Sequence, residues 1–131
     1  MGLFSFLNKK EEIIENQTRV DIHSHLIFGV DDGSQTLEES ISLIKSLVEK
    51  GYTDIITSPH IMADFYKNSK DNLLPIRDII REELQKQNIK INFDVAAEYY
   101  LDDGFEKKLR DKENLLLIND EYILVETSYM N

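Results

Sequence analysis

The sequence contains no cysteine, no tryptophan and only three histidines among its 131 residues. Without cysteine, disulfides, thiolate zinc sites and mechanisms with a cysteine nucleophile are excluded, including those of the cysteine-dependent phosphatases. Positive charge is also scarce, because 15 Lys and Arg residues against 25 Asp and Glu residues leave a net charge of -10. Nucleic-acid phosphates would repel a chain this acidic, so we expect no nucleic-acid partner.

Long hydrophobic runs are absent as well. No run approaches the roughly 20 apolar residues that a membrane-spanning helix needs. Residues 1–7 are mostly apolar and are followed by Lys9 and Lys10, but they lack the charged region that precedes the apolar part of a secretory signal. Phe6 stands where the myristoylation pattern requires Ser or Thr. We therefore predict an amphipathic N-terminal extension over residues 1–17, at most weak membrane-surface contact through it, and a cytoplasmic location.

The remaining composition, 41% hydrophobic and 31% charged, is typical of one soluble globular domain with a real core. Thr36 and Glu39 predict a capping box at the start of a helix that ends before Gly51. Further helices are expected over 72–87, where Pro75 is tolerated only near the first turn, and over 103–111. Strands are expected over 19–24, 53–57, 91–97 and 122–126, with a brief extended piece at 115–118.

This alternation of strands with helices of crossover length predicts a parallel α/β sheet. We expect the core where helical apolar stripes meet the strands, with both Ile55 and Ile56 buried. The second helix would contribute a stripe of Ile76, Ile79, Ile80 and Leu84. A polar loop over 61–71, which contains Phe65 and Tyr66, is long enough to be functional.

Two of the three histidines lie in one short motif, Val20-Asp21-Ile22-His23-Ser24-His25, followed by Asp31-Asp32-Gly33. Alternate side chains of a strand share a face, so Asp21, His23 and His25 are expected on the same side. Imidazole and carboxylate are ligands that zinc, manganese and iron accept. The alternative is one exposed and one buried histidine on an ordinary strand. The paired histidines and the acidic turn favour a metal site.

Metal-type ligands also follow the other predicted strands, at the ends where parallel α/β folds build their sites. His60 comes just after the second strand, Glu98 follows the third, and Glu126 ends the fourth. One such carboxylate is more often an ordinary surface residue, but ligands on four strands of four form a constellation. The candidate metal ligands are therefore His23, His25, Asp32, His60, Glu98 and Glu126.

These motifs resemble the PHP (polymerase and histidinol phosphatase) family of metal-dependent phosphoesterases. The nearer resemblance is to the manganese-dependent protein-tyrosine phosphatases of bacterial capsule and exopolysaccharide synthesis. It covers residues 19–128 in order and rests on Asp21-Ile22-His23-Ser24-His25-Leu26, Gly29-Val30-Asp31-Asp32-Gly33, Leu37-Glu38-Glu39-Ser40, Thr57-Ser58-Pro59-His60, Ala97-Glu98-Tyr99-Tyr100 and Ile123-Leu124-Val125-Glu126.

The resemblance implies a distorted (β/α)7 TIM-like barrel with parallel strands, ligands at their C-terminal ends and two or three ions. The expected ion is Mn²⁺, with Zn²⁺ and Fe²⁺ as alternatives. His23 and His25 would bind the first metal, and Glu98 would bridge the first and second. The remaining implied roles are Glu126 on the second metal, Asp32 and His60 on the third, and Asp31 as the catalytic residue that supports the ligands.

The implied reaction is hydrolysis of phosphotyrosine by a metal-bound hydroxide, with no phosphoenzyme. The implied partner is a tyrosine-phosphorylated protein, such as a capsule or exopolysaccharide tyrosine kinase. Family members are longer, and their later ligands and phosphate-binding arginine are expected beyond residue 131. Residues 18–131 would then be a partial PHP domain, the N-terminal half of the barrel.

Two alternatives stay open: another PHP phosphoesterase, such as a histidinol-phosphatase-like enzyme, and an inactive truncated remnant. Half a barrel exposes a strand edge and apolar surface. The sequence therefore predicts that residues 1–131 alone are marginally stable, self-associating and inactive.

Overall fold

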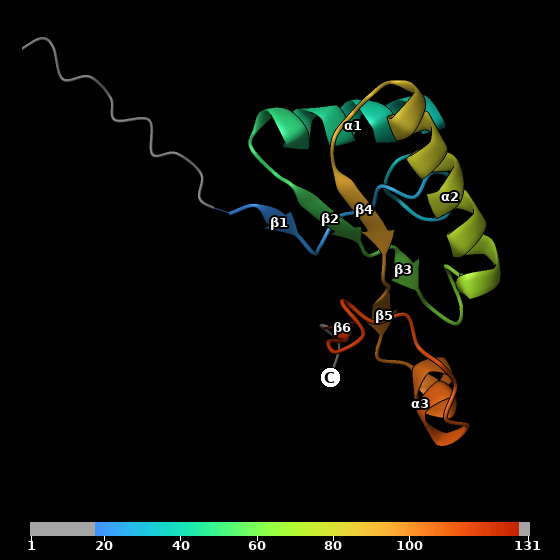
Figure 1. The fold of residues 1–131 in the computed structure, drawn as a ribbon. Helices are drawn as coiled ribbons and strands as arrows, with labels where there is room; N and C mark the ends of the chain where they lie inside the picture. Colours follow the sequence, from blue (N-terminus) through green and yellow to red (C-terminus); the bar gives the residue numbers. More distant parts are fainter. Residues whose placement is uncertain (1–17, 129–131) are drawn as a thin grey trace, which may run out of the picture.

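The computed structural model describes residues 18–128, so the predicted extension over residues 1–17 lies outside the described residues. Within them the chain forms a mixed α/β fold whose paired strands all run parallel (Figure 1). The elements in order are β1 (Val20–Asp21), α1 (Leu37–Glu49), β2 (Asp54–Thr57), β3 (His60–Ile61), α2 (Lys70–Lys86), β4 (Asn92–Val95), β5 (Glu98–Tyr100), α3 (Asp103–Arg110) and β6 (Leu124–Glu126).

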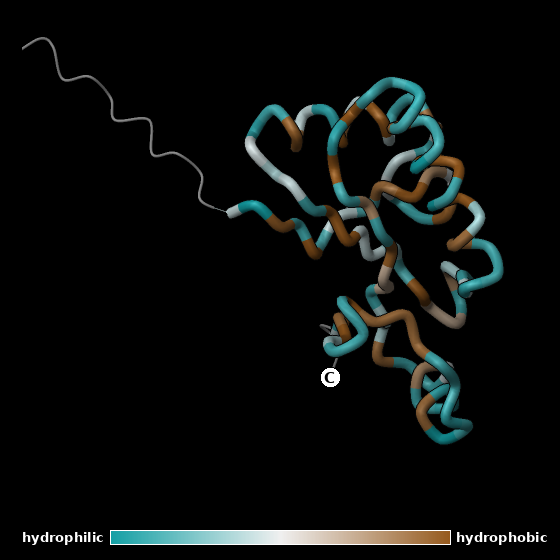
Figure 2. The backbone as a smooth tube through the Cα atoms, in the orientation of Figure 1, coloured by the Kyte–Doolittle hydropathy of each residue, from teal (hydrophilic) through white to brown (hydrophobic). Residues whose placement is uncertain are grey.

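The first sheet has the order β1-β2-β4 and carries α1 and α2 against one face. Residues alternate along each strand, so Ile55 of β2 and its register partner Phe93 of β4 turn into the core. Ile56 points the other way and is only partly buried, so the predicted burial holds for Ile55 and is wrong for Ile56. Figure 2 shows hydrophilic and hydrophobic residues alternating along both helices, as expected for helices with one buried face.

The start of α1 follows the sequence prediction with one change. The Thr36 hydroxyl accepts a hydrogen bond from the Glu39 backbone N–H at 3.2 Å. The Glu39 carboxylate, however, accepts from the N–H of Gln35 at 2.7 Å and not from that of Thr36. The helix ends at Glu49, and Gly51 follows with φ of 94°, a left-handed conformation that glycine adopts without strain.

Helix α2 starts two residues earlier than predicted. Ser69 is its N-cap residue and donates its backbone N–H to the Asn72 side chain at 2.7 Å. Pro75 therefore lies inside the helix, past its first turn, where it removes one backbone hydrogen bond. The buried positions are Leu73, Ile80 and Leu84. Ile79, predicted to belong to the stripe, is 45% exposed, because the buried face includes the earlier Leu73 in its place.

The predicted strand over 91–97 is shorter in the structure, and a second strand that was not predicted separately, β5, follows it in the other sheet. β4 ends at Val95, and after two alanines β5 begins at Glu98. A matching break follows β2, where Ser58 and Pro59 precede β3. The backbone pairing continues across both breaks, since Ala96 N–H donates to the Thr57 carbonyl and Glu98 N–H to the Pro59 carbonyl. Proline has no N–H for a ladder, which accounts for the break at residue 59.

The second sheet, β3-β5-β6, is shorter and less covered (Figure 1). None of the α3 residues is buried; this helix packs mainly through Phe105, whose ring lies 5.4 Å from that of Tyr99. β6 spans three residues and not five, and the predicted extended piece at 115–118 makes only an isolated bridge from Ile118 to Tyr122. Among residues 18–128, every helix is too short or too polar to span a bilayer.

Candidate metal centre

The segment that carries the paired histidines runs beside the end of β2 but is not a strand. β1 ends at Asp21, so the expectation that Asp21, His23 and His25 share a strand face is wrong. The Thr57 hydroxyl takes the place of some backbone-to-backbone hydrogen bonds here. Its Oγ1 donates to the Ser24 carbonyl at 2.7 Å and accepts from the Leu26 N–H at 2.8 Å. The Asp21 carboxylate instead accepts hydrogen bonds from the Ser24 hydroxyl and the His23 N–H.

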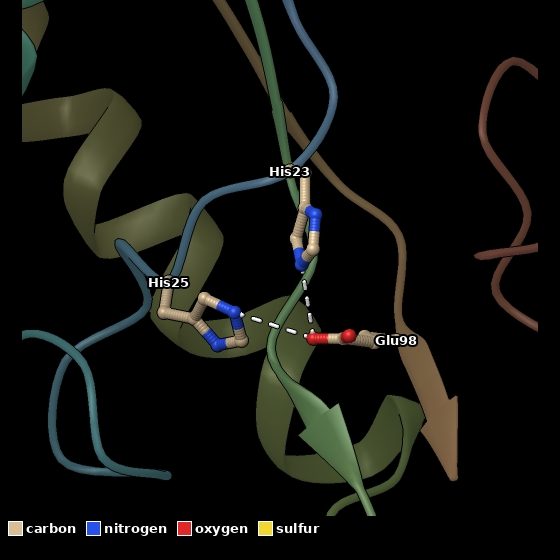
Figure 3. A group of neighbouring side chains, drawn as sticks. All are labelled: His23, His25 and Glu98. Carbon is tan, nitrogen blue, oxygen red and sulfur yellow. Dashed lines mark ion pairs between the residues drawn. The ribbon is translucent and has the colours of Figure 1, made fainter. Parts of the chain in front are cut away.

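His23 and His25 nevertheless converge on one carboxylate, that of Glu98 at the start of β5 (Figure 3). His23 Nε2 lies 3.2 Å and His25 Nε2 lies 3.3 Å from the same oxygen, Glu98 Oε2. The Glu98 side chain is only 7% exposed, whereas that of His23 is 54% exposed. The group therefore extends from a buried carboxylate, Glu98, to a solvent-exposed imidazole, His23.

His60 approaches Glu98 from the neighbouring strand, because it pairs with Glu98 in the β3-β5 register. Its Nδ1 lies 3.4 Å from Glu98 Oε2 and 3.5 Å from Glu126 Oε2, and its Nε2 lies 3.5 Å from Asp32 Oδ1. The His60 side chain is 14% exposed, so it belongs to the floor of the site, and the 65% exposed Asp32 belongs to the rim. The proximity of His60 to Asp32 was expected from the sequence.

The structure thus brings all six predicted ligands together, as three overlapping groups. These are His23 with His25 and Glu98; His25 with Asp32 and His60; and His60 with Glu98 and Glu126. His60 and Glu98 begin the strands that follow the two breaks, and Glu126 ends β6. The other three, His23, His25 and Asp32, lie in the segment after β1.

Three observations indicate that these residues fit metal ions. First, His60 Nδ1 and Glu98 Oε2 are buried and make no hydrogen bond within residues 18–128. Buried polar atoms without partners are costly and therefore rare. Second, two donors each about 2.1 Å from one ion at a tetrahedral angle are about 3.4 Å apart, close to the nitrogen–oxygen distances seen here. Third, the donors are imidazoles and carboxylates, which suit Zn²⁺, Mn²⁺ and Fe²⁺.

Asp31 lies beneath the site and orients His25. Its buried carboxylate accepts from His25 Nδ1 at 2.8 Å and from the backbone N–H groups of His60 and Gly33, each at 3.0 Å. With Nδ1 donating to Asp31, the Nε2 lone pair of His25 faces Glu98. A Cβ on Gly33 would overlap the backbone and Cβ of His25, so this close turn requires glycine.

The same contacts shift the two pKa values in opposite directions. The hydrogen bond to Asp31 raises the pKa of His25 above its ordinary 6.5, although burial opposes this. For Asp31, burial alone would raise the pKa, but the hydrogen bonds from His25, His60 and Gly33 together lower it below 3.8. Asp31 therefore stays ionised at neutral pH and continues to accept the hydrogen bond from His25 Nδ1.

Sequence reasoning did not assign roles to several residues that support this site. The Tyr66 ring stacks on the His60 imidazole, with centroids 5.5 Å apart and planes 10° apart. Asn68 donates to the carbonyls of His60 and Val30 at 2.8 and 3.0 Å. The aromatic pair in an otherwise polar loop was a signal for Tyr66, whereas no local pattern marks Asn68.

Comparisons with known proteins agree with this geometry. Residues 19–131 match the family model described as capsular polysaccharide synthesis, CpsB/CapC. The chain is 32% identical over 109 residues to the tyrosine-protein phosphatase CpsB of Streptococcus agalactiae, covering 83% of this chain and 45% of that protein. It is 27% identical over 107 residues to the putative tyrosine-protein phosphatase CapC of Staphylococcus aureus, covering 82% of this chain and 42% of that one.

A solved structure also matches, with a TM-score of 0.74 and 30% identity over 84% of this chain and 44% of the other. It belongs to work on YwqE from Bacillus subtilis and CpsB from Streptococcus pneumoniae, described as metal-dependent tyrosine phosphatases. This chain spans less than half the length of the curated relatives named above.

Proposed function

The chain belongs to the CpsB/CapC family of capsular polysaccharide synthesis, and from this we propose that it supplies the metal-binding part of a protein-tyrosine phosphatase. The observation that carries the proposal is the buried, unpartnered Glu98 Oε2, which faces imidazole nitrogens of His23, His25 and His60 at 3.2 to 3.4 Å. A carboxylate oxygen so surrounded is suited to bridge two cations.

In this proposal His23, His25 and Glu98 hold one ion, and Glu98 and Glu126 hold a second. Asp32 and His60 hold a third ion, beside His25. A neutral imidazole has one lone pair, so each histidine serves one ion. His25 donates its other N–H to Asp31. The proposed ion is Mn²⁺, with Zn²⁺ or Fe²⁺ as alternatives that the same ligands accept.

When bound, such ions lower the pKa of water for attack on phosphorus and stabilise charge on the phosphoryl oxygens. The chain's own residues perform three tasks. Asp31 keeps Nε2 of His25 free by accepting its other N–H, buried Glu98 keeps its negative charge away from bulk water, and the exposed Asp32 and His23 leave the site open to substrate. A tyrosyl group leaves readily because the phenol pKa is about 10.

Three further parts of the proposal rest on family membership. The fold is proposed as the N-terminal half of a PHP-type barrel over residues 18–131. The substrate is proposed as a tyrosine-phosphorylated protein, such as a kinase of capsule or exopolysaccharide synthesis, and the location as the cytoplasm. The parallel strands, with candidate ligands gathered beside the sheet breaks, support the first of these.

The test has two stages. EDTA-treated chain is titrated with Mn²⁺ by calorimetry, and binding is expected in the unsubstituted chain and lost or strongly weakened in Glu98→Gln. Glu106→Gln, an exposed carboxylate on α3, is the matched control and should bind as the unsubstituted chain does. If the Glu98 variant binds Mn²⁺ as well as the control, the metal assignment is wrong.

Activity is then measured in a chimera in which residues 19–128 replace the matching segment of the Bacillus subtilis relative. With Mn²⁺ we expect hydrolysis of a phosphotyrosine peptide in preference to histidinol phosphate. His25→Ala should abolish it while leaving the circular dichroism spectrum unchanged. Preference for histidinol phosphate would favour the other PHP chemistry, and no turnover of either would favour the inactive remnant.

A further inference from the structure

The loop between β3 and α2 holds an aromatic ring against the candidate metal centre. Tyr66 stacks on His60 with the two planes 10° apart, and His60 lies in turn 4.6 Å from the His25 ring. His60, like His25 and Glu98, belongs to two of the three candidate ligand groups. Any residue that fixes the plane of its imidazole therefore affects how both groups are arranged.

The stack is held by the architecture of the loop. The Tyr66 carbonyl accepts hydrogen bonds from the N–H groups of Met62 and Asn68, at 2.9 and 2.8 Å. Buried Asn68 ties this turn to the His60 carbonyl at 2.8 Å, and Asp102 accepts from the Ala63 N–H at 2.8 Å. The loop is thereby fastened both to His60 and to the start of α3.

His60 needs such a restraint. The ring torsion of histidine is broad, so the backbone of β3 does not by itself set the imidazole plane. The carboxylates that face the ring lie on both of its sides, Glu98 and Glu126 near Nδ1 and Asp32 near Nε2. Neither of these nitrogens is within 3.3 Å of its carboxylates, and Nδ1 makes no hydrogen bond within residues 18–128. The aromatic face of Tyr66 supplies the contact that the polar atoms do not.

We propose that Tyr66 is a positioning residue for metal binding, and that its ring holds the His60 imidazole in the plane required by the ion that uses His60. This inference rests on the proposed function of the site. Removing a group that orients a metal ligand typically weakens affinity about 10- to 100-fold. The ion held by His23, His25 and Glu98 does not use His60 and keeps its affinity.

The test is a Mn²⁺ titration of EDTA-treated chain, followed by calorimetry and by the electron paramagnetic resonance signal of free Mn²⁺. Tyr66→Leu, which keeps bulk but removes the aromatic face, is expected to weaken the His60-dependent binding step about tenfold. Tyr66→Phe keeps the stack and should bind within twofold of the unsubstituted chain. Phe65→Ala, a 77% exposed neighbour on the same loop, is the matched control and should change nothing.

A second readout separates positioning from a general loss of structure. The His60 ring protons should shift in the NMR spectrum of metal-free Tyr66→Leu but not of Phe65→Ala, while the urea midpoint stays within experimental error. Unchanged Mn²⁺ binding in Tyr66→Leu, or equal weakening in Tyr66→Phe, overturns the inference and leaves the metal site standing. If the unsubstituted chain binds no Mn²⁺, the proposed function fails and the inference fails with it.

Discussion

The two sheets of this fold differ in what surrounds their buried side chains. The first, β1-β2-β4, places Ile55, Phe93 and Val95 against two amphipathic helices, so apolar contacts dominate there. Beside the second, β3-β5-β6, lie the short α3 and the segment around Leu116, and Val125 of β6 is 40% exposed. This sheet also contains buried Glu98, which lacks a hydrogen bond at Oε2 within residues 18–128. We infer that the second sheet depends more than the first on what binds to it.

The largest effect should come from removing an apolar side chain from the first sheet. Ile55→Ala leaves a cavity in a fully buried position and should lower the free energy of unfolding by about 3 kcal/mol. Val125→Ala, the matched change in the second sheet, should cost no more than about 0.5 kcal/mol because the side chain is partly in water. Urea unfolding followed by circular dichroism measures both. Equal losses would contradict the difference between the sheets.

Metal addition should have the next largest effect, and it should act on the second sheet. Mn²⁺ at 100 times its dissociation constant stabilises a protein that binds it only when folded by about 2.7 kcal/mol. Hydrogen exchange should show added protection mainly in β3, β5 and β6. His25→Ala serves as the control and should gain less protection, because it lacks a ligand of the first ion. Protection spread evenly over both sheets would mean that the second sheet has no special dependence on the ions.

A smaller effect is expected from loosening the residue beneath the site. Asp31→Asn keeps the size of the side chain but removes the charge that holds His25 Nδ1–H. Metal affinity should fall about tenfold, which corresponds to about 1.4 kcal/mol. The exposed Asp78→Asn, made on α2, should leave affinity unchanged. Calorimetric titration with Mn²⁺ measures the affinity of each variant. Unchanged affinity in Asp31→Asn would show that Asp31 does not position His25 for metal binding.

The smallest change in stability should come from a charge on the edge strand. Val125→Lys places an exposed lysine on β6 and should alter the free energy of unfolding by about 0.5 kcal/mol or less. It should, however, reduce self-association, because lysine on an edge strand discourages pairing with another chain. Light scattering after size exclusion compares the two proteins. A concentration-independent monomer in the unsubstituted chain would contradict the predicted association.

Much of this fold and site follows from local sequence patterns. The Thr36 cap and Gly51 bound α1 because capping and left-handed turns depend on a few adjacent residues. The six candidate ligands were identifiable because each follows or lies in an apolar strand, and parallel strands bring such positions to a common region. Cysteine chemistry was excluded by composition alone. These features need no knowledge of which strands become neighbours.

The tertiary structure decided the rest. The predicted strand over 91–97 ends early, because pairing with a segment broken at Pro59 ends β4 at Val95 and starts β5 at Glu98, opposite His60. Ile55 and Ile56 are equally apolar, and only the side on which α1 and α2 pack determines that Ile55 is the buried one. The Tyr66 stack depends on anchors 38 residues away for Asn68 and 39 for Ala63. Contacts between distant segments produce no periodic pattern in the sequence of either segment, so only the folded chain reveals these contacts.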